Sequence, residues 1–321
     1  MGPIVSMRDS TLVYLNVGGI WYYYDSAKPP LGEGAIGIVY LGFRCDTQDR
    51  VAIKRVNNIY VDNPIVRQLV RYEASMVFDH PNVVKMIGLC EYSNGRGDMF
   101  LICEYVPGIT FKDRATQLSV VSHKDATRQV IEDIRAMLPG LAYLHEKGFI
   151  HRDLKPSNIM IDSASNVKLM DLGTVISMSQ MQKAPQLEFV GTPSYASPEQ
   201  VECKPCDVRS DIYSLGVVLY ELLTGENPFS GSTREDSFHK HIYMPLPSHA
   251  ALPSKLYSII EKATSKNAEE RYTSIGEFDM ALADYLAQEG NNSSKVFKTI
   301  FPVVILIIIG TLLWLLLFFA L

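Results

Sequence analysis

The chain has 321 residues, of which 47% are hydrophobic, and a net charge of −5. This length allows one large domain or two smaller ones with a sizeable core, and a mildly acidic chain without a long basic run argues against nucleic acid as a partner. The five cysteines form an odd, scattered set, which argues against a disulfide framework and favours a reducing compartment.

The predicted elements fall into two groups along the chain. Residues 1–25 are rich in aromatic and β-branched residues, and we expect this N-terminal extension to add a strand or two. Strand-like runs continue to about Val106 and are interrupted by one helix-like stretch over 64–78. From about Ser122 the apolar residues follow a helical period. This order predicts an α+β fold with a small β-rich lobe followed by a larger helical lobe.

The last segment of the sequence is apolar and uncharged, since residues 300–321 read IFPVVILIIIGTLLWLLLFFAL. A bilayer-spanning helix needs about 20 apolar residues, and a buried core helix is the alternative. The polar stretch 289–299 reads as a juxtamembrane linker, and its Lys295 and Lys298 favour the cytoplasmic side. We therefore expect a single-pass, tail-anchored protein of the cell membrane whose folded part faces the cytoplasm.

A glycine-rich stretch, LGEGAIGIV at 31–39, follows Pro29 and Pro30, which remove ladder donors and predict a broken strand. Glycine lets backbone N–H groups approach a phosphate chain closely. The next strand, VAIK at 51–54, ends in Lys54, which could reach phosphate oxygens. The candidate nucleotide-contacting residues of the loop are Leu31, Gly32, Glu33, Gly34, Gly37 and Val39.

The sequence HRDLKPSN at 151–158 is more specific, because it fixes several polar positions at once. Phosphoryl transfer needs a carboxylate that orients the acceptor, an amide that holds metal and cations against the developing charge. Asp153, Asn158 and Lys155 supply these groups within eight residues. Chance rarely produces this pattern together with the downstream DLG at 171–173.

These motifs, in this order, resemble the eukaryotic-type (Hanks-type) protein kinase superfamily over about residues 26–288. The resemblance implies a bilobal protein kinase fold, ATP with Mg²⁺ (or Mn²⁺) as cofactors, and proteins with serine or threonine acceptors as substrates. Within the superfamily, GTPSYASPEQ at 191–200 is most similar to the bacterial membrane-anchored serine/threonine kinases. The sequence leaves a monomer and a homodimer open.

The resemblance also implies roles for single residues. Asp153 would be the catalytic base, and Asn158 and Asp171 would hold the metal. Lys54 would bind the α- and β-phosphates of ATP, and Lys155 resembles the residue of kinases that use serine or threonine acceptors. The hinge that hydrogen-bonds adenine would run from Glu104 to Val106, with Cys103 as the gatekeeper.

Further along the chain, the resemblance implies a scaffold for the acceptor. Thr192 resembles the threonine of the acceptor-binding loop. Glu199 and Arg271 resemble a buried ion pair that holds this loop to the helical lobe. Asp211 resembles the helix aspartate that braces the backbone of the catalytic loop.

Two departures from the family pattern concern the metal and lysine sites. Leu172 replaces the usual phenylalanine of DFG, and we expect it to fill the same apolar position. Glu73 is the favoured partner of Lys54, although it lies two residues closer to the HPN at 80–82 than is usual and Arg71 has the matching register. Two helical residues amount to about 200° of rotation, so a solvated Glu73 is the alternative.

The activation segment, 171–199, lacks the usual switch, because no Ser, Thr or Tyr lies between Gln180 and Gly191. Arg152, before the catalytic Asp, resembles the arginine that binds a phosphate there. One hypothesis is that Glu188 partly replaces that phosphate, and the other is that it is a solvated carboxylate. Ser177 and Ser179 are the candidate autophosphorylation sites.

Two other functions compete with an active kinase that signals from the membrane. One is a membrane-anchored, nucleotide-binding pseudokinase scaffold, against which the complete set of polar motif residues argues. The other is a small-molecule phosphotransferase, against which the acceptor-binding loop argues.

His239 and His241 lie close together in the sequence but have no third side chain with which to bind a metal ion, and we expect both at the surface.

Overall fold

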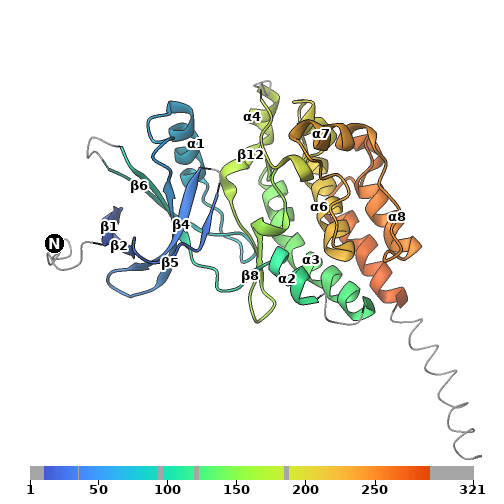
Figure 1. Ribbon diagram of the computed structural model, residues 1–321, viewed down its shortest axis with the longest axis horizontal. Coiled ribbons are helices and arrows are strands. Elements are labelled where there is room, and N and C mark those ends of the chain that lie inside the picture. Colours follow the sequence, from blue (N-terminus) through green and yellow to red (C-terminus); the bar gives the residue numbers. More distant parts are fainter. Residues whose placement is uncertain (1–10, 35, 93–96, 119–122, 184–187, 290–321) are drawn as a thin grey trace, which may run out of the picture.

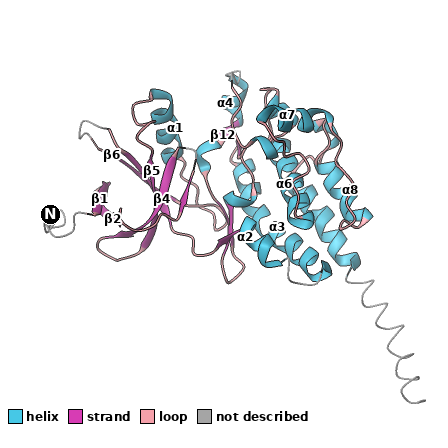
Figure 2. Ribbon diagram, in the orientation of Figure 1, coloured by secondary structure: helices cyan, strands magenta, loops and turns pink. Residues whose placement is uncertain are grey.

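The computed structural model describes residues 11–34, 36–92, 97–118, 123–183 and 188–289, and these form the two lobes that the sequence predicts. Strands occupy the N-terminal lobe and helices most of the C-terminal lobe (Figures 1 and 2). The predicted span, 300–321, and all of the linker but residue 289 lie outside the described residues. Within the described ranges, no helix is long and apolar enough to cross a membrane.

The small lobe is a seven-stranded antiparallel sheet in the order β1-β2-β4-β5-β7-β6, with β3 paired to β4. The strands are β1 (Leu12–Val17), β2 (Ile20–Asp25), β3 (Gly32–Glu33), β4 (Gly37–Arg44), β5 (Arg50–Val56), β6 (Met86–Glu91) and β7 (Met99–Glu104). Helix α1 (Pro64–Ser75) packs on the sheet, and its N-cap Asn63 accepts a hydrogen bond from the amide of Ile65 at 2.9 Å.

The N-terminal extension forms the β1–β2 hairpin, which confirms the strands expected there. The sheet curls until β1 lies next to β6: the Tyr92 hydroxyl donates to the Tyr14 carbonyl, and a Cβ on Gly88 would lie 2.5 Å from a methyl of Val17. Leu15, in β1, is fully buried in the resulting core. The break predicted at Pro29 and Pro30 separates β2 from the two-residue β3.

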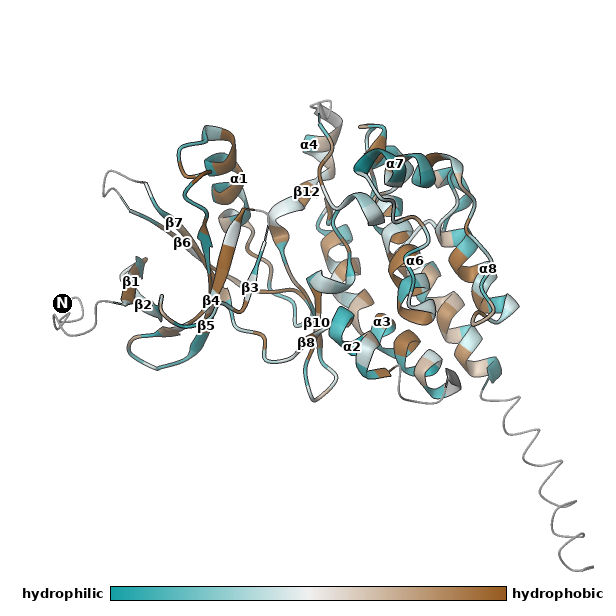
Figure 3. Cartoon of the chain, in the orientation of Figure 1, coloured by the Kyte–Doolittle hydropathy of each residue, from teal (hydrophilic) through white to brown (hydrophobic). Residues whose placement is uncertain are grey.

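The large lobe is built around α6 (Val208–Thr224), in which residues 210–220 are all buried. Its neighbours include α2 (Phe111–Leu118), α3 (His123–Glu146), α8 (Ser254–Ala263) and a helix over 275–289. Figure 3 shows apolar residues along α3 and α6 and hydrophilic residues on α7 (Arg234–Tyr243). A helix buried on every side forms only inside a large core, and this core is the scaffold of the site.

Short elements between the lobes carry the motif residues. Small antiparallel sheets are formed by β8 (Ile109–Thr110), β10 (Ile159–Ile161) and β11 (Val167–Leu169), and by β9 (Phe149–Ile150) and β12 (Ile176–Ser177). Between and after them come η1 (Pro156–Asn158), η2 (Leu172–Thr174), α4 (Met178–Lys183), η3 (Pro193–Tyr195), α5 (Pro198–Val201) and η4 (Ala268–Glu270). Leu172 is 1% exposed and fills its apolar position, as predicted.

Candidate active site

Lys54 lies between the carboxylates of Glu73 and Asp171, in a charge cluster of which Glu73 is the most buried member. Its Nζ is 3.3 Å from both carboxylate oxygens of Glu73 and 3.5 Å from Oδ1 of Asp171. Glu73 is 4% exposed, so its predicted pairing with Lys54 is confirmed. Arg71 points elsewhere and holds Glu91 with contacts of 2.7 and 2.8 Å. Helix α1 therefore presents the carboxylate of Glu73, and not the guanidinium of Arg71, to Lys54.

The protonation states in this cluster follow from burial and charge. Burial alone would lower the pKa of Lys54, but the carboxylates of Asp171 and Glu73 raise it above its usual value. The pKa of Asp171 is lowered, mainly by Lys54, and burial raises the pKa of Glu73 against the opposing effect of Lys54. Lys54 therefore stays a cation and Asp171 an anion, as binding of phosphate and metal requires.

The glycine-rich loop joins β3 to β4, and β4 pairs with the strand that carries Lys54. It is closed by a hydrogen bond from the Gly34 amide to the Gly37 carbonyl, at 2.8 Å. A Cβ on Gly37 would lie 2.5 Å from the Arg55 carbonyl oxygen, whereas a Cβ on Gly32 would meet nothing within 4 Å. Gly37 is thus needed for packing, and Gly32 lies where a ligand can approach the backbone. The structure brings Leu31, Glu33 and Val39 to the same hairpin.

The predicted hinge lies at the end of β7, where the chain passes between the lobes. The carboxylate of Glu104 accepts from Lys168 Nζ at 2.7 Å and from the Lys85 amide at 3.0 Å, so its side chain fixes the hinge rather than facing a ligand. Val106 is buried. Burial raises the pKa of Cys103 to about 12, which keeps this thiol neutral.

The catalytic loop brings Asp153, Lys155 and Asn158 together. Oδ2 of Asp153 is 2.8 Å from Lys155 Nζ and accepts from Asn158 Nδ2 at 3.0 Å. Oδ1 of Asp153 is buried and has no hydrogen-bond partner among the described residues. A buried carboxylate oxygen without a partner is costly, and this oxygen keeps its capacity to accept a hydrogen bond. Lys155 also donates to Thr192 Oγ1 at 2.7 Å, which ties the acceptor-binding loop to the catalytic base.

Asp211 holds this loop from beneath. Its Oδ2 and Oδ1 accept from the amides of His151 and Arg152, both at 2.9 Å, and it is fully buried. The bracing role predicted for Asp211 is confirmed. Arg152 and Asp171 have positive φ values of 66° and 54°. Such backbone strain costs of order 1–3 kcal/mol per residue and persists only where the surroundings enforce it, and the two hydrogen bonds to Asp211 do so at Arg152.

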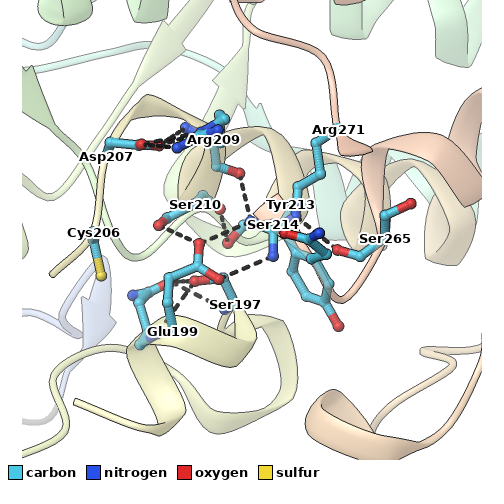
Figure 4. Close-up of polar contacts among 12 residues, drawn as sticks. Ser197, Glu199, Cys206, Asp207, Arg209, Ser210, Tyr213, Ser214, Ser265 and Arg271 are labelled. Carbon is cyan, nitrogen blue, oxygen red and sulfur yellow. Dashed lines mark hydrogen bonds and ion pairs between the residues drawn. The ribbon is translucent and has the colours of Figure 1, made fainter. Parts of the chain in front are cut away.

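The predicted ion pair of Glu199 and Arg271 is present, and Figure 4 shows how it ties α5 to the helical lobe. Nη1 and Nη2 of Arg271 donate to the two carboxylate oxygens at 2.8 and 2.9 Å. Ser210 donates to the same carboxylate at 2.6 Å. Because the Arg271 side chain is 0% exposed, this bidentate pair is a buried anchor.

The hypothesis that Glu188 replaces a phosphate on Arg152 is wrong in this structure. Arg152 is 8% exposed, and its Nε donates to the Thr174 carbonyl at 2.8 Å, whereas Glu188 is exposed and makes no ion pair with it. Ser177 and Ser179 lie within 3.2 Å of each other, and Ser177 also donates to Gln180 Oε1 at 3.0 Å.

His241 shows what a sequence pattern misses. It was expected at the surface, but it is fully buried on α7, and its Nδ1 lies 2.9 Å from the Tyr213 hydroxyl. Burial lowers its pKa to about 3, so it stays neutral. Its neighbour His239 is exposed, as expected. The rings of Phe229 and of Tyr213 on α6 pack against His241, with centroids 5.0 and 5.6 Å away, and a local pattern around residue 241 cannot indicate them.

The residues present fit a nucleoside triphosphate with a hard divalent cation. Asp171 offers a carboxylate that is 41% exposed. The amide nitrogen of Asn158 is committed to Asp153, which leaves its oxygen for a cation. Oxygen ligands and phosphates are what Mg²⁺ prefers, and Lys54 supplies a fixed cation for phosphate oxygens. This donor set indicates phosphoryl transfer.

Comparisons with known proteins agree with this geometry. The protein kinase domain family model matches residues 26–285. The chain is 34% identical over 275 residues to serine/threonine-protein kinase PknB of Mycobacterium tuberculosis, covering 83% of the chain and 43% of that protein. It is 34% identical over 248 residues to serine/threonine-protein kinase PrkC of Bacillus subtilis, covering 75% and 37%.

A third relative is the probable serine/threonine-protein kinase PknB of Lactococcus lactis, 32% identical over 269 residues, which are 81% of the chain and 42% of that protein. The chain thus spans about two fifths of the length of the curated relatives that it matches. The predicted resemblance is confirmed: the chain belongs to the protein kinase domain family, and the relatives described here are bacterial serine/threonine kinases.

Proposed function

We propose that this chain is a protein serine/threonine kinase, which transfers the γ-phosphoryl group of ATP to serine and threonine hydroxyls of proteins. The observation that carries the proposal is the carboxylate of Asp153. Its Oδ2 is held by Lys155 and Asn158, while its buried Oδ1 has no partner among the described residues. That oxygen is placed to accept the proton of an acceptor hydroxyl.

In the proposed reaction, the acceptor oxygen bonds to the γ-phosphorus while the bond from this phosphorus to the β–γ bridging oxygen breaks. The hydroxyl proton passes to Oδ1 of Asp153, and ADP leaves. Lys155 stabilises the developing negative charge and Lys54 orients the phosphates. Asp171 and Asn158 would hold a divalent cation, Mg²⁺ or Mn²⁺, which neutralises phosphate charge when it is bound.

The pseudokinase alternative predicts binding without transfer. Against it, Lys54 is paired with Glu73, and Asp153 and Asn158 are in hydrogen-bond contact, so none of the polar groups is missing or displaced. The small-molecule alternative leaves the acceptor-binding loop without a purpose, although Lys155 and the Glu199–Arg271 ion pair both fix that loop. The names of the relatives support serine and threonine as acceptors.

The test compares the full-length chain with its Asp153→Asn variant, each incubated with labelled ATP, Mg²⁺ and a generic protein substrate. Loss of the base typically lowers the rate by a factor of about 10²–10⁴, so we expect labelling only by the wild type. Equal labelling by both proteins would overturn the proposal. Nucleotide binding by both without any transfer would establish the pseudokinase alternative.

We further propose that residues 300–321 hold the kinase at the cell membrane with its catalytic lobes in the cytoplasm, where it signals. The support is the length of the uncharged segment and the flanking Lys295 and Lys298. Deletion of 296–321 should move the protein from the membrane to the soluble fraction, and unchanged fractionation would contradict the proposed anchor.

Two other proposals have their own tests. Autophosphorylation at Ser177 and Ser179 is tested by mapping the phosphorylated residues of the purified kinase, and a homodimer is tested by crosslinking the protein in membranes.

A further inference from the structure

The acceptor-binding loop, 191–197, is ordered although the usual phosphate site before it has no hydroxyl. No Ser, Thr or Tyr lies between Gln180 and Gly191. Arg152, which would bind a loop phosphate, is buried, and its Nε donates to the Thr174 carbonyl. Lys155 holds Thr192, near the start of the loop, and a second contact holds the residues just before it.

This second contact is a cluster of two aromatic rings and one guanidinium: Phe189 from the activation segment, and Arg234 and Phe238 from α7. The centroids of the two rings are 4.8 Å apart, with their planes at 58°. The guanidinium carbon of Arg234 lies 5.0 Å from the Phe189 centroid and 4.9 Å from the Phe238 centroid. One cation therefore contacts both rings, and each contact is within the range of a cation–π interaction.

Phe189 comes just before the acceptor-binding loop in the sequence, so the cluster fixes the chain where it enters the loop. Gly191, two residues after Phe189, has φ 121°, and a Cβ there would lie 2.9 Å from the Arg152 carbonyl oxygen. The loop thus packs against the catalytic loop at this point. At its other end, Gln200 donates to the same carbonyl at 2.8 Å and forms a capping box with Ser197. The loop is therefore fixed at both ends.

We propose that Phe189, Arg234 and Phe238 are positioning residues, which hold the acceptor-binding loop in its productive conformation without a phosphate on the activation segment. The inference rests on the proposed kinase function. Its physical basis is that the cluster uses apolar and cation–π contacts, which form with the chain as translated. The kinase should accordingly phosphorylate proteins before any modification of its own loop.

The cluster contributes a ring–ring contact and two cation–π contacts at a partly exposed site. Removing the Phe189 ring removes the ring–ring contact and one of the two cation–π contacts. We expect Phe189→Ala to lower kcat/KM for a protein substrate about tenfold, which corresponds to about 1.4 kcal/mol. The ATP Kd should change less than about twofold, because Lys54 and the glycine-rich loop do not contact the cluster.

The experiment compares the full-length chain with five variants. Phe189→Ala and Phe238→Ala each remove one ring, their double variant tests coupling, and Phe189→Tyr keeps the ring. Phe43→Ala is the matched control, because Phe43 stacks on Tyr23 at 5.5 Å and belongs to β4. Figure 1 shows β4 in the small lobe and α7 at the far side of the large lobe. For each protein, kcat and KM for the protein substrate, the ATP Kd and hydrogen exchange of residues 189–197 are measured.

In both single alanine variants we expect faster hydrogen exchange of residues 189–197 and a tenfold lower kcat/KM for the protein substrate. The double variant should lose no more activity than either single variant. Phe189→Tyr and Phe43→Ala should have near-wild-type exchange and activity. Wild type treated with a phosphatase should keep its activity. The proposal is overturned if Phe189→Ala behaves like Phe43→Ala, or if phosphatase treatment abolishes activity.

The exchange readout separates this proposal from the proposed function. If wild type transfers no more phosphate than Asp153→Asn, the kinase function fails, whereas exchange of 189–197 still reports whether the cluster orders the loop. If exchange is unchanged by Phe189→Ala in an active kinase, the positioning role alone fails.

Discussion

Replacement of Glu199 by alanine would leave Arg271 buried without its counter-charge. All five N–H donors of Arg271 are used: besides Glu199, they bind the carbonyls of Ser265 at 2.7 Å, Arg209 at 3.1 Å and Lys266 at 3.1 Å. The variant removes the two contacts to Glu199 and keeps the charge in a side chain that is 0% exposed.

The expected cost follows from this burial. Breaking a buried ion pair by removing one partner costs about 3–5 kcal/mol, a large part of the stability of about 5–15 kcal/mol of a typical domain. The matched control is Glu132→Ala, which breaks the pair of Glu132 and Arg128 on the surface of α3, where the side chains are 42% and 57% exposed. Such exposed pairs contribute about 0.3–0.5 kcal/mol.

The assay is urea unfolding of the full-length proteins, read as the free energy of unfolding. The reasoning is refuted if Glu199→Ala loses no more stability than Glu132→Ala. A double variant, Glu199→Leu with Arg271→Leu, should be more stable than Glu199→Ala, because it removes the uncompensated charge as well. A double variant as unstable as the single one would show that lost packing, and not the buried charge, sets the cost.

The pH dependence of this pair has a definite sign. Burial alone would raise the pKa of Glu199, but the hydrogen bonds and charge of Arg271 lower it below its usual value of 4.5. The pair therefore stabilises the fold fully above about pH 4.5 and loses its contribution as the pH falls through the lowered pKa. The difference in stability between wild type and Glu199→Ala should narrow below about pH 4.5.

Three further predictions use matched or reversible perturbations. Gly37→Ala should destabilise the chain by about 1–3 kcal/mol, since its Cβ would lie 2.5 Å from the Arg55 carbonyl oxygen. Gly32→Ala, whose Cβ would meet nothing within 4 Å, should have little effect. Equal melting temperatures of the two variants would contradict this prediction. Leu15→Ala should lower the free energy of unfolding in urea by about 2–5 kcal/mol, because Leu15 is fully buried. Ile20→Ala should lower it much less, because Ile20 is 36% exposed. Similar losses in the two variants would show that the β1–β2 hairpin is not part of the core. Chelation of divalent cations by EDTA should abolish phosphoryl transfer and excess Mg²⁺ should restore it, and transfer that persists in EDTA would contradict the roles proposed for Asp171 and Asn158.

The sequence predicts much of the site because its chemistry lies in short motifs. Asp153, Lys155 and Asn158 occur within six residues, so the turn that joins them brings them together almost irrespective of the rest of the fold. The α+β order of the lobes is likewise readable, since strand and helix periods are local. The partner of Lys54 was predicted correctly only by an electrostatic argument that a carboxylate, and not Arg71, must face the lysine.

Other features depend on contacts between segments that are distant in sequence, and only the tertiary structure decides them. His241 is buried by Tyr213 and Phe229, and Arg152 is bound to the Thr174 carbonyl rather than to Glu188. The contact between Phe189 and α7 joins residues about 50 positions apart. Sequence by itself therefore determined which groups carry the chemistry, whereas packing decided which side chains meet, because long-range contacts follow from how the elements fit together and not from any local period.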